Sequence, residues 1–155
     1  MEIREATVAD ITGIVDIGHT TWPETYRFAG PDYIAHGLAG WWSPEAVARS
    51  LSTTTVLVAT DDDGPIATGN IDLRGEVPII WKLYVHPDVQ SAGVGSALIR
   101  ALLDLAPGRP VRLEHLDGND RAARFYARHG FALLRREAAD QAEWPDTIWL
   151  ERPAS

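Results

Sequence analysis

The stretch Leu83–Leu98 reads LYVHPDVQSAGVGSAL and carries the strongest structural signal in the chain. An apolar strand ends near Val85, a loop with a proline follows, and Gly93 and Gly95 stand one residue apart where a helix begins. The first turn of a helix has unpaired N–H groups and a partial positive charge, so it attracts anions. Glycines at that position let a phosphate approach the main chain closely. The stretch therefore predicts a phosphate-binding helix N-terminus.

Three kinds of phosphate-binding loop combine a strand, a glycine-rich turn and a helix. A nucleotide P-loop needs Gly-Lys-Ser/Thr at the helix start, but Gly95 is followed by Ser96 and Ala97, so the lysine is missing. A dinucleotide-binding fingerprint needs a third glycine where Leu98 stands, and it normally lies between parallel strands. The third kind is the pattern Gln-x-x-Gly-x-Gly, which Gln90–Gly95 matches at every fixed position.

The sequence on either side of this stretch alternates between β-rich runs and amphipathic helices. The β-rich runs predict strands over residues 3–6, 55–60, 66–73, 77–85, 111–115, 131–136 and 147–150. Apolar spacing and capping residues predict helices that begin near residues 8, 44, 94 and 120, the last two ending near residues 105 and 128. Residues 21–42 are expected to be irregular or briefly helical. This order predicts an α+β protein with one central mixed sheet.

Length and composition limit the kind of protein. The chain has 155 residues and a mass of 17.0 kDa, which fits one domain over residues 1–155. It contains no cysteine, which excludes disulfides, thiolate metal sites and cysteine nucleophiles. The N-terminus lacks the basic start and apolar core of a signal peptide, and no apolar run approaches the ~20 residues that cross a bilayer. We therefore expect a cytoplasmic protein that has no membrane partner.

Negative charge is concentrated in the first half of the chain. Residues 1–80 hold 4 Arg against 12 Asp and Glu, whereas residues 81–155 hold 10 Lys and Arg against 10 Asp and Glu, so the net charge of −8 arises from the first half. This balance argues against a general nucleic-acid-binding role, because phosphate attraction needs a basic face. An acidic half facing an arginine-containing half suits a cationic ligand that meets an anionic one, and a solubilising acidic surface explains the charges equally well.

Two motifs in the right order resemble the GNAT superfamily of acyl-CoA-dependent N-acetyltransferases. The first is an apolar-Val-x-Pro strand end followed by Gln-x-x-Gly-x-Gly, which Leu83–Pro87 and Gln90–Gly95 match. The second, about thirty residues later, comprises Asn119, the aromatic pair Phe125-Tyr126 and the pair Gly130-Phe131 at the family's usual spacing. The resemblance covers most of the chain. It implies a GNAT-like α/β/α fold, in which a mixed, mostly antiparallel central sheet is splayed between its middle strands.

The resemblance also implies that acetyl-CoA binds at the glycine-rich stretch. Main-chain N–H groups there would hold its pyrophosphate, in agreement with the anion argument above. The strand end at Leu83 and Val85 would pair with the pantetheine arm like an added strand, and the Val85 N–H would stabilise the oxyanion that forms on the thioester. Asn119 would hydrogen-bond along the pantetheine. The residues implied for the pyrophosphate are Gln90, Ser91, Ala92, Gly93, Val94, Gly95 and Ser96.

Tyr126 matches the family's general acid, which protonates the departing CoA sulfur. An ordinary phenol, with a pKa near ~10, keeps its proton at neutral pH. We assign the general base that deprotonates the ammonium to Glu76, acting through water, with Glu114 and Asp72 as alternatives. Because the chain has no cysteine, the amine is expected to attack the thioester directly in a ternary complex. No cluster of His, Asp or Glu has metal-ligand spacing, so no metal is expected.

The acceptor is expected between the early helices and the sheet, where the resemblance implies it. Trp22 and Tyr26 offer aromatic faces and Glu24 a carboxylate, a combination that suits an ammonium group through cation–π and charge contacts. This predicts a small primary amine or amino sugar, with a peptide N-terminus or lysine as an alternative. Three further tryptophans in or near strands are interpreted as structural: Trp81, Trp144 and Trp149.

A second class of function stays open, namely a catalytically silent module that binds or senses acyl-CoA. Loss of Tyr126 or of the glycines would favour such a module, and both are present. The partners implied by the resemblance are acetyl-CoA and an amine. A homodimer is also possible, although no residues indicate an interface.

Overall fold

A computed structural model describes residues 1–90 and 93–155 of the chain. The strands within these ranges are β1 (Glu2–Glu5), β2 (Thr55–Asp61), β3 (Gly64–Asp72), β4 (Ile79–Val85), β5 (Val111–Leu116), β6 (Ala132–Glu137) and β7 (Thr147–Arg152). The α-helices are α1 (Ile11–Thr25), α2 (Pro31–Trp41), α3 (Pro44–Thr53), α4 (Val94–Leu103) and α5 (Asp120–Arg128).

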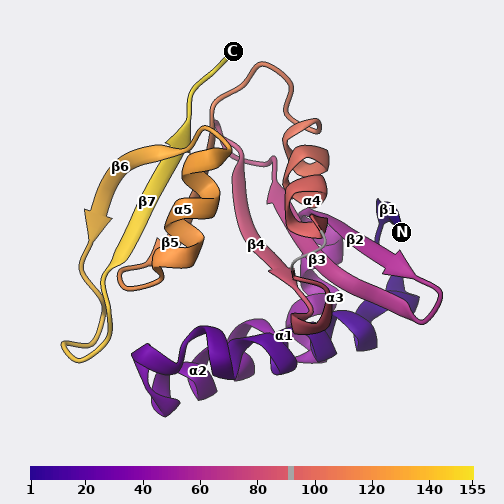
Figure 1. Cartoon of the computed structure of the whole chain (residues 1–155), viewed down its shortest axis with the longest axis horizontal. Helices are drawn as coiled ribbons and strands as arrows, with labels where there is room; N and C mark the ends of the chain where they lie inside the picture. Colours follow the sequence, from indigo (N-terminus) through magenta and orange to yellow (C-terminus); the bar gives the residue numbers. More distant parts are fainter. Residues whose placement is uncertain (91–92) are drawn as a thin grey trace.

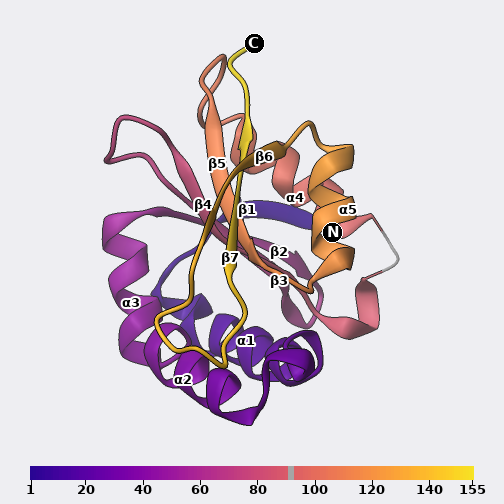
Figure 2. The same cartoon turned by 90° about the vertical axis from the view of Figure 1, so that its left-hand side faces the viewer.

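The strands form one sheet in the order β1-β2-β3-β4-β5-β7-β6. Neighbouring strands are antiparallel except for β4 and β5, which run parallel in the middle of the sheet. Helices α1, α2 and α3 cover one face, and α4 and α5 cover the other (Figures 1 and 2). The fold is therefore α/β/α with a mixed, mostly antiparallel sheet, which confirms the predicted fold class.

Each face of the sheet has its own hydrophobic core. On the α4 side, the apolar stripe of that helix packs on β2–β4, and Leu98, Ile99 and Leu102 are fully buried there. On the α1 side, Trp42 and Val58 are fully buried in a cluster rich in aromatic side chains. The sheet therefore separates a mainly aliphatic core from one rich in aromatic side chains, and a ligand between its strands would meet both.

Most of residues 21–42 lies in the end of α1 and in α2, so the segment is more helical than the expected irregular or briefly helical one. Pro23 is a helix-breaking residue in sequence terms, yet it lies in the last turn of α1, close to the helix end at Thr25. Gly30 then adopts a φ of +94°, which few other residues adopt, and Pro31 begins α2 at its first position. The Gly-Pro pair is the sequence signal that predicts this second helix.

Two tight glycine contacts hold the tryptophans of the aromatic core in place. A Cβ atom added at Gly18 of α1 would lie 2.1 Å from the Trp42 ring, and one added at Gly37 of α2 would lie 2.1 Å from the Trp22 ring. Each helix therefore approaches an indole more closely than any residue with a Cβ permits. The positions of both tryptophans depend on these two glycines.

We expect Gly18→Ala to destabilise the protein by about 1–3 kcal/mol, because the added methyl overpacks the Trp42 site. Urea unfolding monitored by circular dichroism measures the change. Gly40→Ala is the matched control, since it makes the same substitution on α2 where nothing lies within 4 Å. That control should leave stability unchanged or raise it by up to about 1 kcal/mol, because alanine favours helix. Equal effects of the two substitutions would contradict the packing argument.

Candidate active site

The central feature of the site is a split between β4 and β5. These parallel strands pair only through Ile79 with Arg112 and Ile80 with Leu113, and beyond these residues they diverge (Figure 1). A cleft of about 530 Å³ lies at the split and extends between α4 and α5. The split confirms the expectation of a sheet that is splayed between its middle strands.

The end of β4 turns main-chain groups into this split. The His86 N–H donates to the Ile66 carbonyl at 2.8 Å, so this antiparallel pair is a hydrogen-bonded one. Because such pairs alternate along a ladder, the N–H and C=O groups of Leu83 and Val85 point away from β3, towards the side that β5 has left. The Val85 carbonyl accepts from the Gln90 side chain at 3.1 Å on that side. An extended ligand can therefore pair with this strand edge.

Helix α4 begins at the edge of the same cleft. Gly93 adopts a φ of +76° just before the helix and lines the cleft together with Gly95 and Ser96. The Val94 side chain is buried in the core, so only its main chain is available to a ligand. Ser91 and Ala92, which the sequence also assigns to the phosphate site, lie outside the described residues. The helix start thus supplies an anion-binding end on the floor of the cleft.

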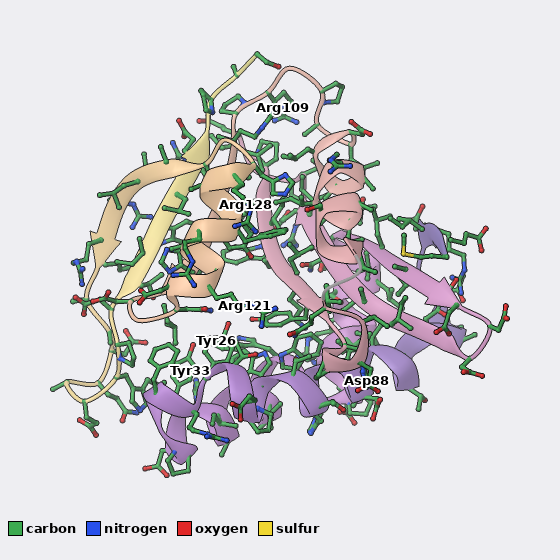
Figure 3. The ribbon with its side chains drawn as sticks, in the orientation of Figure 1. Tyr26, Tyr33, Asp88, Arg109, Arg121 and Arg128 are labelled. Carbon is green, nitrogen blue, oxygen red and sulfur yellow. The ribbon has the colours of Figure 1, made fainter. Side chains whose placement is uncertain are left out.

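Three arginines on α5 face this helix start, and the sequence reasoning did not include them. Arg121, Arg124 and Arg128 recur at helical spacing on one side of α5 and line the cleft. Figure 3 shows Arg121 and Arg128 on the side of α5 that is turned towards α4. Arg121 also donates to the Gln90 side-chain oxygen at 3.0 Å, which ties α5 to the loop before α4. Guanidinium groups bind phosphate well, so the cleft suits an anionic ligand on both walls.

Asn119 and Tyr126 lie in the wall of the cleft that α5 forms. The Asn119 side chain accepts from the Ala122 N–H at 3.3 Å and caps the helix. The Tyr126 ring is 9% exposed and packs edge-on against Phe125 and Phe131. Burial raises the pKa of Tyr126 well above its ordinary value. The phenol therefore stays protonated at any physiological pH and is available as a hydrogen-bond donor.

A second, smaller cleft of about 210 Å³ meets the first at the split, on the α1–α2 side of the sheet. Tyr26 lines both clefts, and its hydroxyl lies 2.7 Å from the Tyr84 hydroxyl. Trp22 is buried and stacks on Tyr33 at a centroid distance of 5.7 Å. Figure 3 shows Tyr26 and Tyr33 above the N-terminal helices, towards the sheet. Of the residues expected at the acceptor site, Trp22 and Tyr26 are therefore brought together.

Trp81 differs from the structural role that the sequence suggests for it. It is 43% exposed and lines both clefts. The pairing of β3 with β4 shifts by one residue between Asn70 and Ile71, opposite Trp81, so Trp81 is the extra residue of a β-bulge. A bulge leaves no pattern in the sequence. The prediction for Trp81 assumes a regular strand, in which this side chain would have a different orientation.

Glu114 is the carboxylate at the meeting point of the two clefts. It is the first residue of β5 after the last pair with β4, and it lines both cavities. Its surroundings raise the pKa of Glu114, first by removing water and then through the nearby Glu137 carboxylate, while Arg135 opposes the shift. A carboxylate with a raised pKa in a cleft is suited to accept a proton.

The other carboxylates named from the sequence lie elsewhere. Glu76 is exposed in the loop between β3 and β4, at the opposite end of β4 from Val85, because the strand begins at Ile79 and not at residue 77. Asp72 forms two hydrogen bonds with the Arg74 guanidinium, which hold the pKa of Asp72 well below its usual range. Glu24 is exposed and bonds Arg27. None of the three is among the residues that line either cleft.

Comparisons with known proteins agree with this geometry. A family model described as the acetyltransferase (GNAT) domain matches residues 52–133, more than half of the chain. The chain belongs to the GNAT family. Peptidyl-lysine N-acetyltransferase YjaB from Salmonella typhimurium is 33% identical over 102 residues, which are 65% of this chain and 66% of that protein, just under two thirds of its length.

Solved structures of GNAT proteins share the fold. PaiA N-acetyltransferase from Thermoplasma acidophilum in complex with coenzyme A superposes with a TM-score of 0.82 at 21% identity, covering 98% of each chain. The solution structure of apo-form YjaB from Escherichia coli superposes with a TM-score of 0.74 at 23% identity, covering 99% of this GNAT chain and 98% of that one. The expectations of a GNAT acyltransferase domain, and of acetyl-CoA as its co-substrate, are confirmed at the level of the family.

Two further features of this GNAT chain concern metals and membranes. Among residues 1–90 and 93–155, no group of three His, Asp or Glu side chains could hold a metal ion. In the same residues, no helix combines the length and the apolar character that a membrane crossing requires.

Proposed function

We propose that residues 1–155 form a single N-acetyltransferase domain that moves the acetyl group of acetyl-CoA to a primary amine of a small molecule. The observation that carries this proposal is the meeting of two clefts at the split between β4 and β5, one cationic and one aromatic. Each cleft suits one of two substrates, and the split joins them. The amine then attacks the thioester directly, and the cysteine-free chain forms no acyl-cysteine.

Acetyl-CoA supplies an acetyl thioester when it is bound, and the larger cleft fits its anionic part. The N–H groups at the start of α4 and the arginines of α5 would hold the phosphates, with Gly93 and Gly95 allowing close approach. Leu83, through its main-chain N–H and C=O, and Val85, through its N–H, would pair with the pantetheine arm, while the Val85 carbonyl accepts from Gln90. The side-chain oxygen of Asn119 forms the helix-cap bond, so its amide nitrogen would donate a hydrogen bond to the same arm.

Two donors would stabilise charge during transfer. The Val85 N–H is turned towards the split and would donate to the thioester oxygen on which negative charge develops. The Tyr126 phenol would donate a hydrogen bond to the departing sulfur and then transfer its proton to it. Burial raises the pKa of Tyr126, so the phenol is protonated before the reaction. As the C–S bond breaks and Tyr126 protonates the sulfur, the second proton of the attacking nitrogen would replace the one that the phenol has lost.

Glu114 replaces Glu76 as the proposed general base. An alkylammonium has an ordinary pKa near ~10.4 and must lose a proton before it attacks. The Glu114 carboxylate lies at the junction of the two clefts, where that proton is released, and its raised pKa increases its basicity. Glu76 lies in an exposed loop outside both clefts.

We expect Glu114→Gln to lower kcat/KM by about 100-fold or more at pH 7. The loss should shrink as the pH approaches 10, because free amine becomes abundant without a base. In the wild type, activity should fall as the pH drops through the raised pKa of Glu114, since the protonated carboxyl no longer accepts a proton. Profiles of kcat/KM from pH 4 to 10 measure both effects. A larger loss in Glu76→Gln than in Glu114→Gln would restore the assignment made from the sequence.

The experiment that tests the proposed function is calorimetric titration with acetyl-CoA, with ATP as a comparison, followed by an assay for thiol release with a panel of amines. Saturable binding of acetyl-CoA but not ATP, together with amine-dependent thiol release, is the expected result. Binding without transfer to any amine would favour the silent acyl-CoA-binding module. Absence of acetyl-CoA binding would defeat the proposal.

A peptide acceptor is the second candidate, and the name of the Salmonella relative favours it. That relative is a peptidyl-lysine N-acetyltransferase, and a lysine side chain could enter the aromatic cleft from outside. Mass spectrometry of a lysine-containing peptide incubated with acetyl-CoA tests this alternative. Transfer to the peptide at a higher kcat/KM than to any free amine would replace the small-molecule acceptor.

A further inference from the structure

Lys82 is a partly buried cation that forms no ion pair with any carboxylate of the described residues. Its ammonium donates to the Trp41 carbonyl and lies 4.0 Å from the centre of the Trp42 ring. None of the ion pairs within residues 1–90 and 93–155 includes it. Burial lowers the pKa of Lys82 to about 8, so it is mostly charged at pH 7. A partly buried ammonium that has a carbonyl and an aromatic ring for neighbours, and no carboxylate in contact, is suited to pair with an anion that arrives with a ligand.

The β-bulge at Trp81 directs Lys82 into the acceptor side of the sheet. Ile80, before the bulge, is buried in the core beneath α4, whereas Lys82, after it, packs over Trp42 in the aromatic layer. The Lys82 N–H donates to the Asn70 side chain at 2.9 Å, so a buried asparagine replaces the main-chain partner that the bulge removes. Bulges often re-aim a side chain next to an active site. The hydrogen bond from the Lys82 N–H to the Asn70 side chain stabilises the bulge at Trp81.

The smaller cleft therefore carries one cation and one anion among aromatic walls. Lys82 and Glu114 both line it, and both follow closely after the last pair between β4 and β5, Ile80 with Leu113. Trp22 and Trp42 also line this cleft. Their indole nitrogens are buried and have no hydrogen-bond acceptor within the part of the chain that the structure describes. At about 210 Å³ the cavity holds roughly seven water molecules, which is the size of an amino acid.

Resting on the proposed acetyltransferase function, we infer that the acceptor is a free α-amino acid with an aromatic or large apolar side chain. Its carboxylate would pair with Lys82, its side chain would fill the aromatic cleft, and its amino group would face Glu114 at the split. A polycationic amine is disfavoured, because Lys82 would repel its second charge. A lysine side chain in a peptide brings no carboxylate for Lys82.

The experiment compares two acceptors that differ in the carboxylate. We would measure kcat/KM with acetyl-CoA for L-phenylalanine and for phenethylamine, adding spermidine and a lysine-containing peptide as rivals. The wild type should prefer phenylalanine over phenethylamine by about 10- to 100-fold, the range of a charge-assisted hydrogen bond. In Lys82→Met this ratio should fall close to one, and Lys82→Arg, which keeps the charge, should retain part of it. Cooperative thermal unfolding checks that each variant is folded.

The wild-type ratio decides without any variant. Faster transfer to phenethylamine, spermidine or the peptide would overturn the inference and leave the acetyltransferase function standing. Acetyl-CoA binding without transfer to phenylalanine would overturn it as well. A preference for phenylalanine that survives in Lys82→Met would mean that another group binds the carboxylate, and it would overturn the role inferred for Lys82. Failure of acetyl-CoA binding in calorimetry would instead be a failure of the proposed function, which separates the two.

Discussion

Tyr126→Phe should lower kcat by about 10²- to 10⁴-fold while acetyl-CoA binds with nearly its original affinity. The substitution removes one hydroxyl and keeps the ring that packs between Phe125 and Phe131. Since the phenol is needed only when negative charge appears on the sulfur, its loss affects turnover and not ground-state binding. Steady-state thiol release gives kcat, and calorimetric titration gives the acetyl-CoA affinity. Parallel losses of both would count against the acid role.

Tyr33→Phe is the matched control for this prediction. Tyr33 is also buried, and burial raises its pKa to about 12. Of the two clefts, Tyr33 lines only the smaller one, so its hydroxyl lies away from the proposed path of the departing sulfur. We expect its loss to change KM for the amine more than kcat. A loss of kcat in Tyr33→Phe as large as in Tyr126→Phe would mean that phenol deletion disturbs the site in general.

Much of the fold follows from local sequence signals. The helix over α5 is marked by Asn119 at its cap and by Gly130 just beyond its end, and both signals depend only on neighbouring residues. The turn before α4 can be predicted in the same way, because glycine readily adopts the left-handed φ that Gly93 has. The family resemblance adds the splayed sheet, which no local signal contains.

The parts of the site that the sequence analysis missed depend on tertiary structure. Glu76 is predicted immediately before a strand over residues 77–85, and the actual strand begins two residues later, at Ile79, so that carboxylate lies in the loop at the opposite end of β4 from Val85. Trp81 and Lys82 line the smaller cleft because the pairing of β4 with β3 contains a bulge at Trp81. Glu114 is named from the sequence only as an alternative to Glu76, because its place at the split becomes clear only once the pairing of β4 with β5 is seen to end at Leu113.

The α5 arginines are an intermediate case. Arg121, Arg124 and Arg128 repeat at i, i+3 and i+7, so the sequence does predict one basic helix face. Their function depends on the neighbour of that face, and only the folded chain shows that it is turned towards the start of α4 (Figure 3). The net charge of −8 conceals this cationic wall, because acidic residues elsewhere outweigh it.

Gly95→Glu should weaken acetyl-CoA binding by at least about 100-fold. A Cβ at Gly95 would meet Phe125 at 3.5 Å and Val85 at 3.6 Å, which are ordinary contacts, so the variant should fold. Its carboxylate would enter the larger cleft, where two like charges about 4 Å apart repel by about 4 kcal/mol at a partly exposed site. Calorimetric titration measures the loss. Gly95→Gln adds nearly the same bulk without charge and should bind more tightly than Gly95→Glu.

Gly40→Glu completes this test, because it adds the same charge on α2, where nothing lies within 4 Å of the new Cβ. Neither cleft includes Gly40 among its lining residues. Its effect on affinity should therefore be limited to the weak, salt-screened repulsion that any added surface carboxylate exerts on an anion. If Gly95→Glu bound acetyl-CoA as well as Gly40→Glu does, the phosphates would have to bind away from the start of α4. The roles proposed for Gly93, Ser96 and the α5 arginines would then be wrong together, since all of them depend on that placement.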